Sequence, residues 1–273
     1  MMEEMDKPKL NFVERIVYTR PIKMPKMHFH GRHELYYLEK GRAKYFIDNE
    51  IFSLESGDII FVPKGTFHKT DSEDGGSGVE RLLLVFADEF LGPEAQKYIE
   101  ELKKDKFVRV NQETLHKFKE IFRKIESEDS KRQTDYYELE RLYLTELLIL
   151  ISRYRIKDLP ITLKPTHRII QEAAKYISSN YASNLTLQTL ADKYAMSPGH
   201  FSKQFKRITG VGLNEYINIA RISAAEEMLT NSNLPITTVA TECGFNDSNY
   251  FAAVFKRLKG ITPKKFSMIS VKS

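Results

Sequence analysis

The sequence predicts a two-domain protein of the α+β class, with an antiparallel β domain at the N-terminus and an all-α domain at the C-terminus. Three observations predict it. Residues 9–87 read as short strands between turn signals, the next segment changes to a helical period, and everything beyond residue 166 is helical and contains a repeat. The expected division is a β domain at 1–90, a helical extension at 91–156, a linker at 157–165 and a helical domain at 166–270.

Composition places the chain among globular proteins. It has 273 residues, of which 41% are hydrophobic, enough to build two cores. The single Cys243 excludes an intrachain disulfide and a cysteine-based zinc finger, and we expect it to be a small buried residue. There is no run of about 18 apolar residues, and the N-terminal MMEEMDKPKL lacks the basic start of a signal peptide. Both features predict a cytoplasmic protein with no membrane partner.

Charge is distributed unevenly along the chain, whose formal net charge is +5. The residues from Lys164 to Ser273 include 14 Lys and Arg against 7 Asp and Glu, a net charge of +7, so the rest of the chain carries −2. A basic C-terminal domain favours an anionic partner such as nucleic acid. A basic face that is merely solvated gives the same balance, so this interpretation needs a motif to support it.

The N-terminal domain is expected to be a sandwich or barrel of short strands, followed by three helices. Runs rich in β-branched and aromatic residues, such as ELYYLEKG, AKYFIDNE, GDIIFVPKG and VERLLLVFA, are separated by Gly, Asp-Asn and Pro signals. The segments PEAQKYIEELKK, QETLHKFKEIFRKIESED and QTDYYELERLYLTELLILISRYRI then predict helices. Pro160 and Pro165, with no helical period around them, mark the linker.

The last of these helices, expected over residues 134–155, has two apolar stripes. One stripe is Tyr136, Leu139, Tyr143, Leu147, Leu150 and Tyr154, and the other is Tyr137, Leu144, Leu148 and Ile151. If one stripe covers the sheet and the other meets a second subunit, the chain forms a homodimer through this helix. The alternative is that both stripes pack inside one chain.

The helical domain contains two copies of one pattern. LQTLADKYAMSPGHFSKQFKRITG aligns with ITTVATECGFNDSNYFAAVFKRLKG with one inserted residue, and each copy predicts a short amphipathic helix, a tight turn and a second helix. Ser197-Pro198 and Asn246-Asp247 offer caps for the second helices. Gly244 supplies a left-handed residue for the second turn, whereas Ala195 stands at that place in the first, which implies strain or a different turn.

The second helix of each copy has the two faces that a recognition helix needs. Its inner face carries phenylalanines, and its outer face carries small, polar and basic residues, which suit entry into the major groove, contact with base edges and contact with phosphates. A long helix between the copies, with an apolar stripe of Leu213, Tyr216, Ile217, Ala220, Ala224 and Met228, would hold both units about 34 Å apart on one side of DNA. The alternative is a helical bundle that repeats by chance.

The stretch RISAAEEMLTNSNLPITTVATECGFNDSNYFAAVFKRLKGITPKKF strongly resembles the C-terminal signature of AraC-type (AraC/XylS) transcription regulators. The resemblance covers about the last hundred residues and implies tandem helix-turn-helix units, an activator of transcription, and double-stranded DNA, RNA polymerase and a small-molecule effector as partners. Carried over by position, base contacts fall on Gly199, Ser202 and Lys203 and on Ser248, Asn249 and Ala253; the basic residues farther along are Lys206, Arg207, Lys256 and Arg257. Gly199 and Ala253 lack larger polar side chains, so we expect weak direct readout there.

The N-terminal domain resembles cupins, which implies an antiparallel β jelly roll. HFHGRHELYYLEKG and GDIIFVPKGTFH provide His28, His30, Glu34 and His68 at the spacing of the two cupin motifs, and Tyr36 shares a strand face with Glu34. Three imidazoles and a carboxylate could hold a divalent transition metal such as zinc, iron, nickel or manganese.

A metal-free effector pocket for a sugar or another metabolite is the alternative. Tyr36, Tyr45 and Phe61 would provide its stacking surfaces if they point inward. His33 is expected to lie in a turn or at the surface.

The sequence therefore predicts a sequence-specific DNA-binding regulator whose cupin-like domain senses a small molecule such as a sugar or a metal ion. The candidate cofactor is a divalent transition metal in the cupin-like domain. A metal-dependent cupin enzyme with an accessory DNA-binding tail is the alternative. No Ser-His-Asp, Cys-His or Walker-type arrangement indicates another chemistry.

Overall fold

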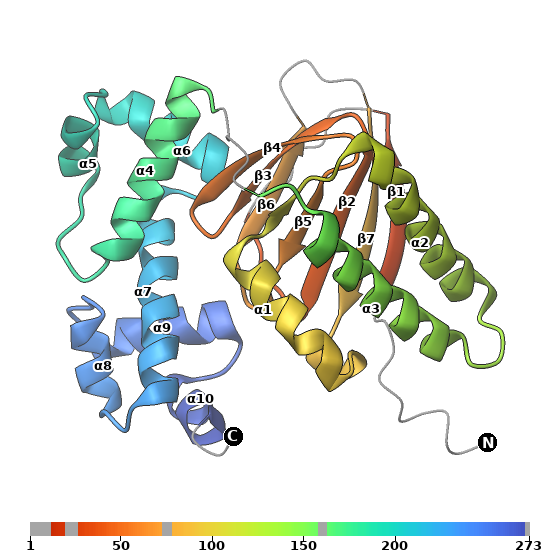
Figure 1. Ribbon diagram of the computed structural model, residues 1–273. Helices are drawn as coiled ribbons and strands as arrows, with labels where there is room; N and C mark the ends of the chain where they lie inside the picture. The colour runs from red at the N-terminus through yellow and green to blue at the C-terminus, as the bar shows by residue number, and fades with distance from the viewer. Residues whose placement is uncertain (1–11, 20–26, 73–77, 158–162, 271–273) are drawn as a thin grey trace. The chain divides into compact units, whose positions relative to one another are not determined.

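A computed structural model of the protein describes residues 12–19, 27–72, 78–157 and 163–270 (Figure 1). The chain divides into two compact units, Met1–Leu163 and Lys164–Ser273, which are described separately. Most of the predicted linker, residues 158–162, lies outside the described residues.

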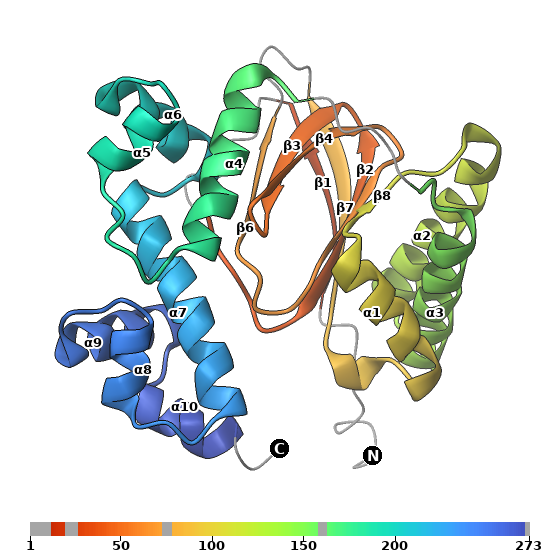
Figure 2. The ribbon, with the colours of Figure 1, turned by 60° about the vertical axis from the view of Figure 1, so that its left-hand side comes forward.

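Two antiparallel sheets lie face to face in the N-terminal unit, as the predicted antiparallel jelly roll requires (Figure 2). The larger sheet has the strand order β1-β7-β2-β5-β8, and the smaller has the order β4-β3-β6. The strands are β1 (Phe12–Tyr18), β2 (His33–Lys40), β3 (Arg42–Ile47), β4 (Glu50–Glu55), β5 (Ile59–Val62), β6 (His68–Ser72), β7 (Val79–Phe86) and β8 (Phe107–Val108).

Strand alternation divides the side chains of β2 between two cores. Tyr36 and Leu38 lie between the sheets and pack in one cluster with Tyr45 of β3. Leu35 and Tyr37 point to the other face of the larger sheet, where Tyr37 stacks on Phe122 with 4.4 Å between ring centroids. Both faces of β2 are therefore buried.

Three helices cover the outer face of the larger sheet, and two short 3-10 turns lead into them. The elements are η1 (Asp88–Phe90), η2 (Pro93–Ala95), α1 (Gln96–Lys104), α2 (Gln112–Lys131) and α3 (Tyr136–Tyr154). The three predicted helices are thus confirmed. The predicted helical extension also contains a strand, β8, because the chain returns between α1 and α2 to pair with β5.

The two predicted stripes of α3 have different environments. The stripe Tyr137, Leu144, Leu148 and Ile151 is buried in the core beneath the helix, together with Leu147 of the other stripe. The remaining members of the first stripe are only half-buried, and Leu142 beside them is 55% exposed. Tyr143, Leu150 and Tyr154 of the first stripe also pack against this core, so both stripes contribute to it, and Leu142 is the large apolar residue of α3 that stays exposed.

The buried face of α3 contains a carboxylate. The sequence analysis predicted the helix here but not the burial of this side chain. Glu140 is 1% exposed, and its Oε1 has no hydrogen-bond partner among the described residues. Burial, with the charges of Asp129 and Glu128 adding to it against that of Arg132, raises the pKa of Glu140 to about 7. The folded state therefore binds a proton that the unfolded chain releases between pH 4.5 and pH 7.

Stability should accordingly fall as the pH rises through this window, and Glu140→Gln should remove that loss. We expect the variant to gain about 2–3 kcal/mol in unfolding free energy at pH 8 and little at pH 4.5. Urea denaturation at the two pH values measures it, with the exposed Glu146→Gln as a control that changes neither. An equal effect of Glu140→Gln at both pH values would contradict the assignment.

The C-terminal unit is all-α, as predicted. Its helices are α4 (Pro165–Ser179), α5 (Leu187–Lys193), α6 (Pro198–Thr209), α7 (Leu213–Asn231), α8 (Ile236–Glu242), α9 (Ser248–Lys259) and α10 (Pro263–Ser270). The pairs α5–α6 and α8–α9 are the two helix-turn-helix motifs, and α7 connects them (Figure 1).

The helix α7 is buried more widely than its predicted stripe. Leu213, Tyr216 and Ile217 of that stripe are buried, but Ala220, Ala224 and Met228 are half-buried. Ile222, Ala225 and Leu229 are buried instead, in the core of the second motif. The helix packs against both motifs, and this explains why a single stripe did not describe it. Within the described residues, no helix is both long and apolar enough to cross a membrane.

Candidate functional site

The second helix of each motif begins at a capped N-terminus, as predicted. In the first motif, the side chain of Ser197 accepts a hydrogen bond from the backbone N–H of His200, and Pro198 follows as the first helical residue. In the second motif, Asp247 accepts from the backbone N–H groups of Asn249 at 2.6 Å and Tyr250 at 2.8 Å. These caps fix where each recognition helix starts.

The two turns adopt the same left-handed conformation although one contains alanine. The φ angle is 51° at Ala195 and 81° at Gly244. Of the two outcomes predicted for Ala195, strain rather than a different turn is therefore observed. Gly244 has a second constraint, because a Cβ atom there would lie 2.7 Å from the carbonyl oxygen of Ala182.

The predicted faces of α6 and α9 are confirmed in their burial. Phe201, Phe205, Phe251 and Phe255 are fully buried. On the opposite faces, the exposed residues are Gly199, His200, Lys203, Lys206, Arg207, Asn249, Ala253, Lys256 and Arg257, while Ser202, Ser248 and Ala252 are half-buried. Every residue predicted to contact DNA thus lies at or near the surface. Their individual contacts with bases and phosphates stay predictions.

Two polar contacts that the sequence did not reveal join α9 to α7. Arg257 donates to both carboxylate oxygens of Glu215, at 2.7 and 3.0 Å. The Asn218 amide donates to the hydroxyl of Tyr250 at 3.0 Å, and the Tyr250 side chain is otherwise largely exposed. Arg257 would therefore have to share its charge between Glu215 and a phosphate, whereas Lys206 has no ion pair within the described part of the chain.

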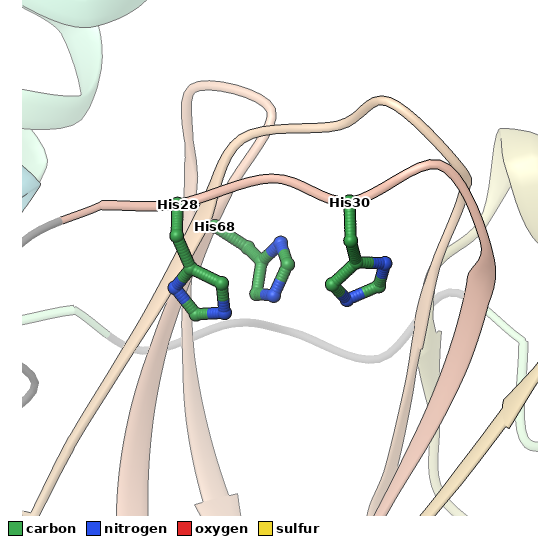
Figure 3. Close-up of side chains that lie close together, drawn as sticks. All are labelled: His28, His30 and His68. Atoms are coloured by element: carbon green, nitrogen blue, oxygen red, sulfur yellow. The ribbon is translucent and has the colours of Figure 1, made fainter. Parts of the chain in front are cut away.

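Three histidines meet at one end of the sandwich (Figure 3). His28 and His30 precede β2, and His68 begins β6; the backbones of His28 and His68 exchange hydrogen bonds of 3.1 and 2.9 Å. One ring nitrogen from each histidine lies within 4.8 Å of the others. The sequence-predicted set is therefore assembled from separate segments.

The predicted carboxylate lies beside two of the three histidines. Glu34 is 6% exposed, and its Oε2 lies 3.0 Å from Nε2 of His30 and 3.8 Å from Nε2 of His68. Its other oxygen, Oε1, accepts a hydrogen bond of 2.8 Å from the hydroxyl of Tyr45. We call His28, His30, Glu34 and His68 the histidine cluster.

Backbone carbonyls orient two of the imidazole rings. The Nδ1 of His30 donates to the carbonyl of Arg32 at 2.8 Å, and the Nδ1 of His68 donates to the carbonyl of Thr66 at 2.9 Å. Both Nε2 atoms are thereby directed toward Glu34. The Nε2 of His68 is buried and has no hydrogen-bond partner in the described parts of the chain. It is a free acceptor facing a carboxylate, an arrangement that a bound cation would satisfy.

Protonation in the cluster follows from these contacts. Burial lowers the pKa of His68 to about 4, and the hydrogen bond to Glu34 raises the pKa of His30. Burial alone would raise the pKa of Glu34, but the hydrogen bond from His30 lowers it overall. At neutral pH, Glu34 is a carboxylate and His68 a neutral imidazole, the forms that bind a metal ion. The proton between His30 and Glu34 would compete with that ion.

Two aromatic predictions need correction. His33 does not lie in a turn or at the surface: it is fully buried on the helix side of the larger sheet, beside Phe61 at 5.2 Å between centroids and 2.8 Å from Asp88. Phe61 points to the same side and cannot stack on a ligand between the sheets. Alternation explains both errors, because odd-numbered residues of β2 and β5 face the helices. Tyr36 and Tyr45 do point inward.

The sequence analysis did not predict the buried cation on the inner face of the larger sheet. Arg81 stands in the apolar strand β7 and shares the inner face with Val79 and Leu83, and only 6% of it is exposed. The sequence signal that could have revealed Arg81 is a charged residue inside the apolar run VERLLLVF. Its partners come from β1 and β2, so no local pattern links them to it.

Comparisons with known proteins agree with both halves of the structure. The description "AraC-like ligand binding domain" matches residues 20–145, and "Helix-turn-helix domain" matches residues 190–268. The transcriptional activator RhaR of Mannheimia succiniciproducens is 25% identical over 93% of this chain and 90% of its own length. The activator RhaS of an Enterobacter species is 23% identical over 87% of this chain and 86% of its own length. A solved structure of ToxT from Vibrio cholerae covers 96% of this chain and 99% of that chain, at 17% identity and a TM-score of 0.39.

The chain therefore belongs to the AraC family of transcription regulators, with an AraC-type DNA-binding domain behind a cupin-like ligand-binding domain. It is a DNA-binding transcription regulator. The relatives are regulators as well, so the comparisons give no support to the alternative of a metal-dependent cupin enzyme.

Proposed function

We propose that this protein is a cytoplasmic activator of transcription that uses α6 and α9 to bind successive major grooves of DNA. The observation that carries the proposal is the pair of capped, outward-facing recognition helices that share α7 as a common support. The names of RhaR and RhaS as activators support activation. RNA polymerase is the proposed protein partner, as the resemblance to AraC-type regulators implies. A promoter-reporter assay tests this part, and repression by the wild-type protein would contradict it.

The side chains divide by position on each recognition helix. Ser202, Lys203, Ser248 and Asn249 lie toward the helix starts, where base edges are reached, with Gly199 and Ala253 allowing close approach. Lys206, Arg207, Lys256 and Arg257 lie in the last turns, where they would meet phosphates.

Variants at the two kinds of position should differ in salt dependence and specificity. Lys206→Ala should weaken binding to all sequences and reduce the slope of log K against log salt by about 1. Asn249→Ala should cost about 1–3 kcal/mol, mainly through lost preference at one base pair. Fluorescence anisotropy with specific and random duplexes at several salt concentrations measures both, with the exposed Lys104→Ala of α1 as a control. Equal losses on both duplexes for both variants would contradict the assigned roles.

The N-terminal domain is proposed to bind the effector at the histidine cluster, and a divalent transition metal fits this cluster. The Nε2 of His68 supports the fit, because it faces Glu34 and has no hydrogen-bond partner within the described ranges. His28, His30 and His68 would be the nitrogen ligands and Glu34 the oxygen ligand. Such an ion would supply a Lewis-acid anchor for oxygen atoms of a small molecule. The proposal includes no catalytic step.

A measurement of metal content distinguishes a metal site from a metal-free effector pocket. We expect about one ion per chain in untagged protein, lost in the double variant His28→Ala/His30→Ala, because two of three nitrogen ligands are removed. Inductively coupled plasma mass spectrometry measures it. His116→Ala, which removes an exposed histidine of α2, should leave the content unchanged. A wild-type protein without metal would favour the metal-free effector pocket.

We also propose that α3 forms a homodimer through its exposed side. Leu139, Leu142 and Ile149 lie on this side, and none of them belongs to the fully buried part of the intrachain core. An effector would act by binding two states of the protein with different affinity.

A charged residue introduced on the exposed side of α3 should weaken the proposed dimer. Leu142→Glu is expected to weaken dimerisation about a hundredfold, since each copy would bury a carboxylate in an apolar contact. Sedimentation velocity over a concentration series measures it. Val17→Glu is the control, because Val17 is 62% exposed on β1 and lies outside the proposed interface. An unchanged dimer in Leu142→Glu would place the interface elsewhere.

A further inference from the structure

The inner face of the sandwich holds a buried cation near the histidine cluster. The guanidinium carbon of Arg81 lies 5.7 Å from the ring centroid of Tyr18 and 5.5 Å from that of Tyr36. Its Nη2 donates to the Tyr18 hydroxyl at 3.3 Å, and the Glu14 carboxylate is 3.7 Å away. A guanidinium has five N–H donors, and a buried charge is stable only when it is well paired. These two long contacts leave most of its donors without a close partner among the described residues.

A buried hydroxyl lies beside this cation. Tyr36 is 1% exposed, and its hydroxyl has no hydrogen-bond partner in the part of the chain that the structure describes. The Tyr36 ring contacts Tyr45 at 5.1 Å between centroids, and the Tyr45 ring stacks on His68 at 6.0 Å. Arg81, Tyr36 and Tyr45 therefore form a continuous inner row that ends at the histidine cluster.

We propose that the effector is a small carboxylic acid, such as a sugar acid or a hydroxy acid, whose carboxylate binds between Arg81 and the Tyr36 hydroxyl. Its hydroxyl groups would lie toward Glu34 and the histidine cluster. This inference rests on the proposed effector-sensing function of the domain. The planar guanidinium matches a carboxylate with two parallel hydrogen bonds, and the tyrosine hydroxyl adds a third donor.

The single positive charge of Arg81 fits a ligand carboxylate better than a ligand phosphate. Arg81 and Lys69 are the buried cationic side chains in the described part of the N-terminal unit, and Lys69 lies 2.5 Å from the carboxylate of Asp71. Arg81 alone therefore faces the ligand, with Glu14 nearby as a competing anion. One cation balances a monovalent carboxylate but not a phosphate dianion.

Acetate is the probe that tests the carboxylate position directly. We expect the arginine Nε–H signals of ¹⁵N-labelled full-length protein to show one saturable shift as sodium acetate rises to about 100 mM at constant ionic strength. This signal should be missing in Arg81→Lys, which cannot form the paired hydrogen bonds. Inorganic phosphate should not saturate it. Absence of a saturable shift of the Arg81 signal, or equal saturation by phosphate, overturns the proposal.

Two tyrosine variants separate a ligand contact from a structural role. Tyr36→Phe should weaken acetate binding about tenfold without loss of stability, because its hydroxyl has no hydrogen-bond partner among the residues that the structure describes. Tyr37→Phe is the matched control. It removes another buried hydroxyl of the same strand that lacks a hydrogen-bond partner in the described structure, but on the helix side. It should leave acetate affinity unchanged. Unchanged binding in Tyr36→Phe, or an equal loss in both variants, overturns the proposal.

Failure of the carboxylate proposal can be distinguished from failure of the proposed regulatory function. DNA affinity and metal content are measured on the same wild-type and Arg81→Lys samples. Intact DNA binding and metal content without acetate binding would reject the carboxylate position alone. Absence of DNA binding in the wild-type protein would reject the regulator itself.

Discussion

The burial of α7 between two helix-turn-helix motifs is the constraint on which the DNA-binding domain depends. Ile222, Ala225 and Leu229 pack in the core of the second motif, and Tyr216 contacts Phe205 of the first at 5.1 Å between ring centroids. Because interiors are close-packed, neither recognition helix can turn on α7 without opening a core. This shared support holds α6 and α9 in a fixed relation, which binding to successive grooves of one duplex requires.

The central strand β2 imposes the corresponding constraint on the N-terminal domain. Its even-numbered side chains, Glu34 and Tyr36, face the proposed effector, while His33 and Tyr37 pack against the opposite side. A ligand that shifts β2 would therefore change the contact between Tyr37 and Phe122 of α2. This gives a physical route from the effector to the helices of the same domain. The route regulates DNA binding only if the effector has different affinities for two states.

The sequence was sufficient wherever the determining signal was local or repeated. The caps at Ser197 and Asp247 and the four buried phenylalanines followed from aligning two copies, and the histidine cluster followed from motif spacing. Errors arose where a residue's surroundings come from distant segments. His33 and Phe61 were misplaced because both faces of the larger sheet are covered, and Arg81 and Glu140 acquire their buried environments only through packing of separate elements.

The most direct test of the central claim is selection of DNA by the full-length protein from a pool of random duplexes, followed by sequencing. The account predicts two enriched segments whose centres lie about 10–10.5 base pairs apart, one for each recognition helix on one side of the duplex. A single enriched segment, or two segments with no fixed spacing, would contradict the claim that α7 holds both helices for joint binding.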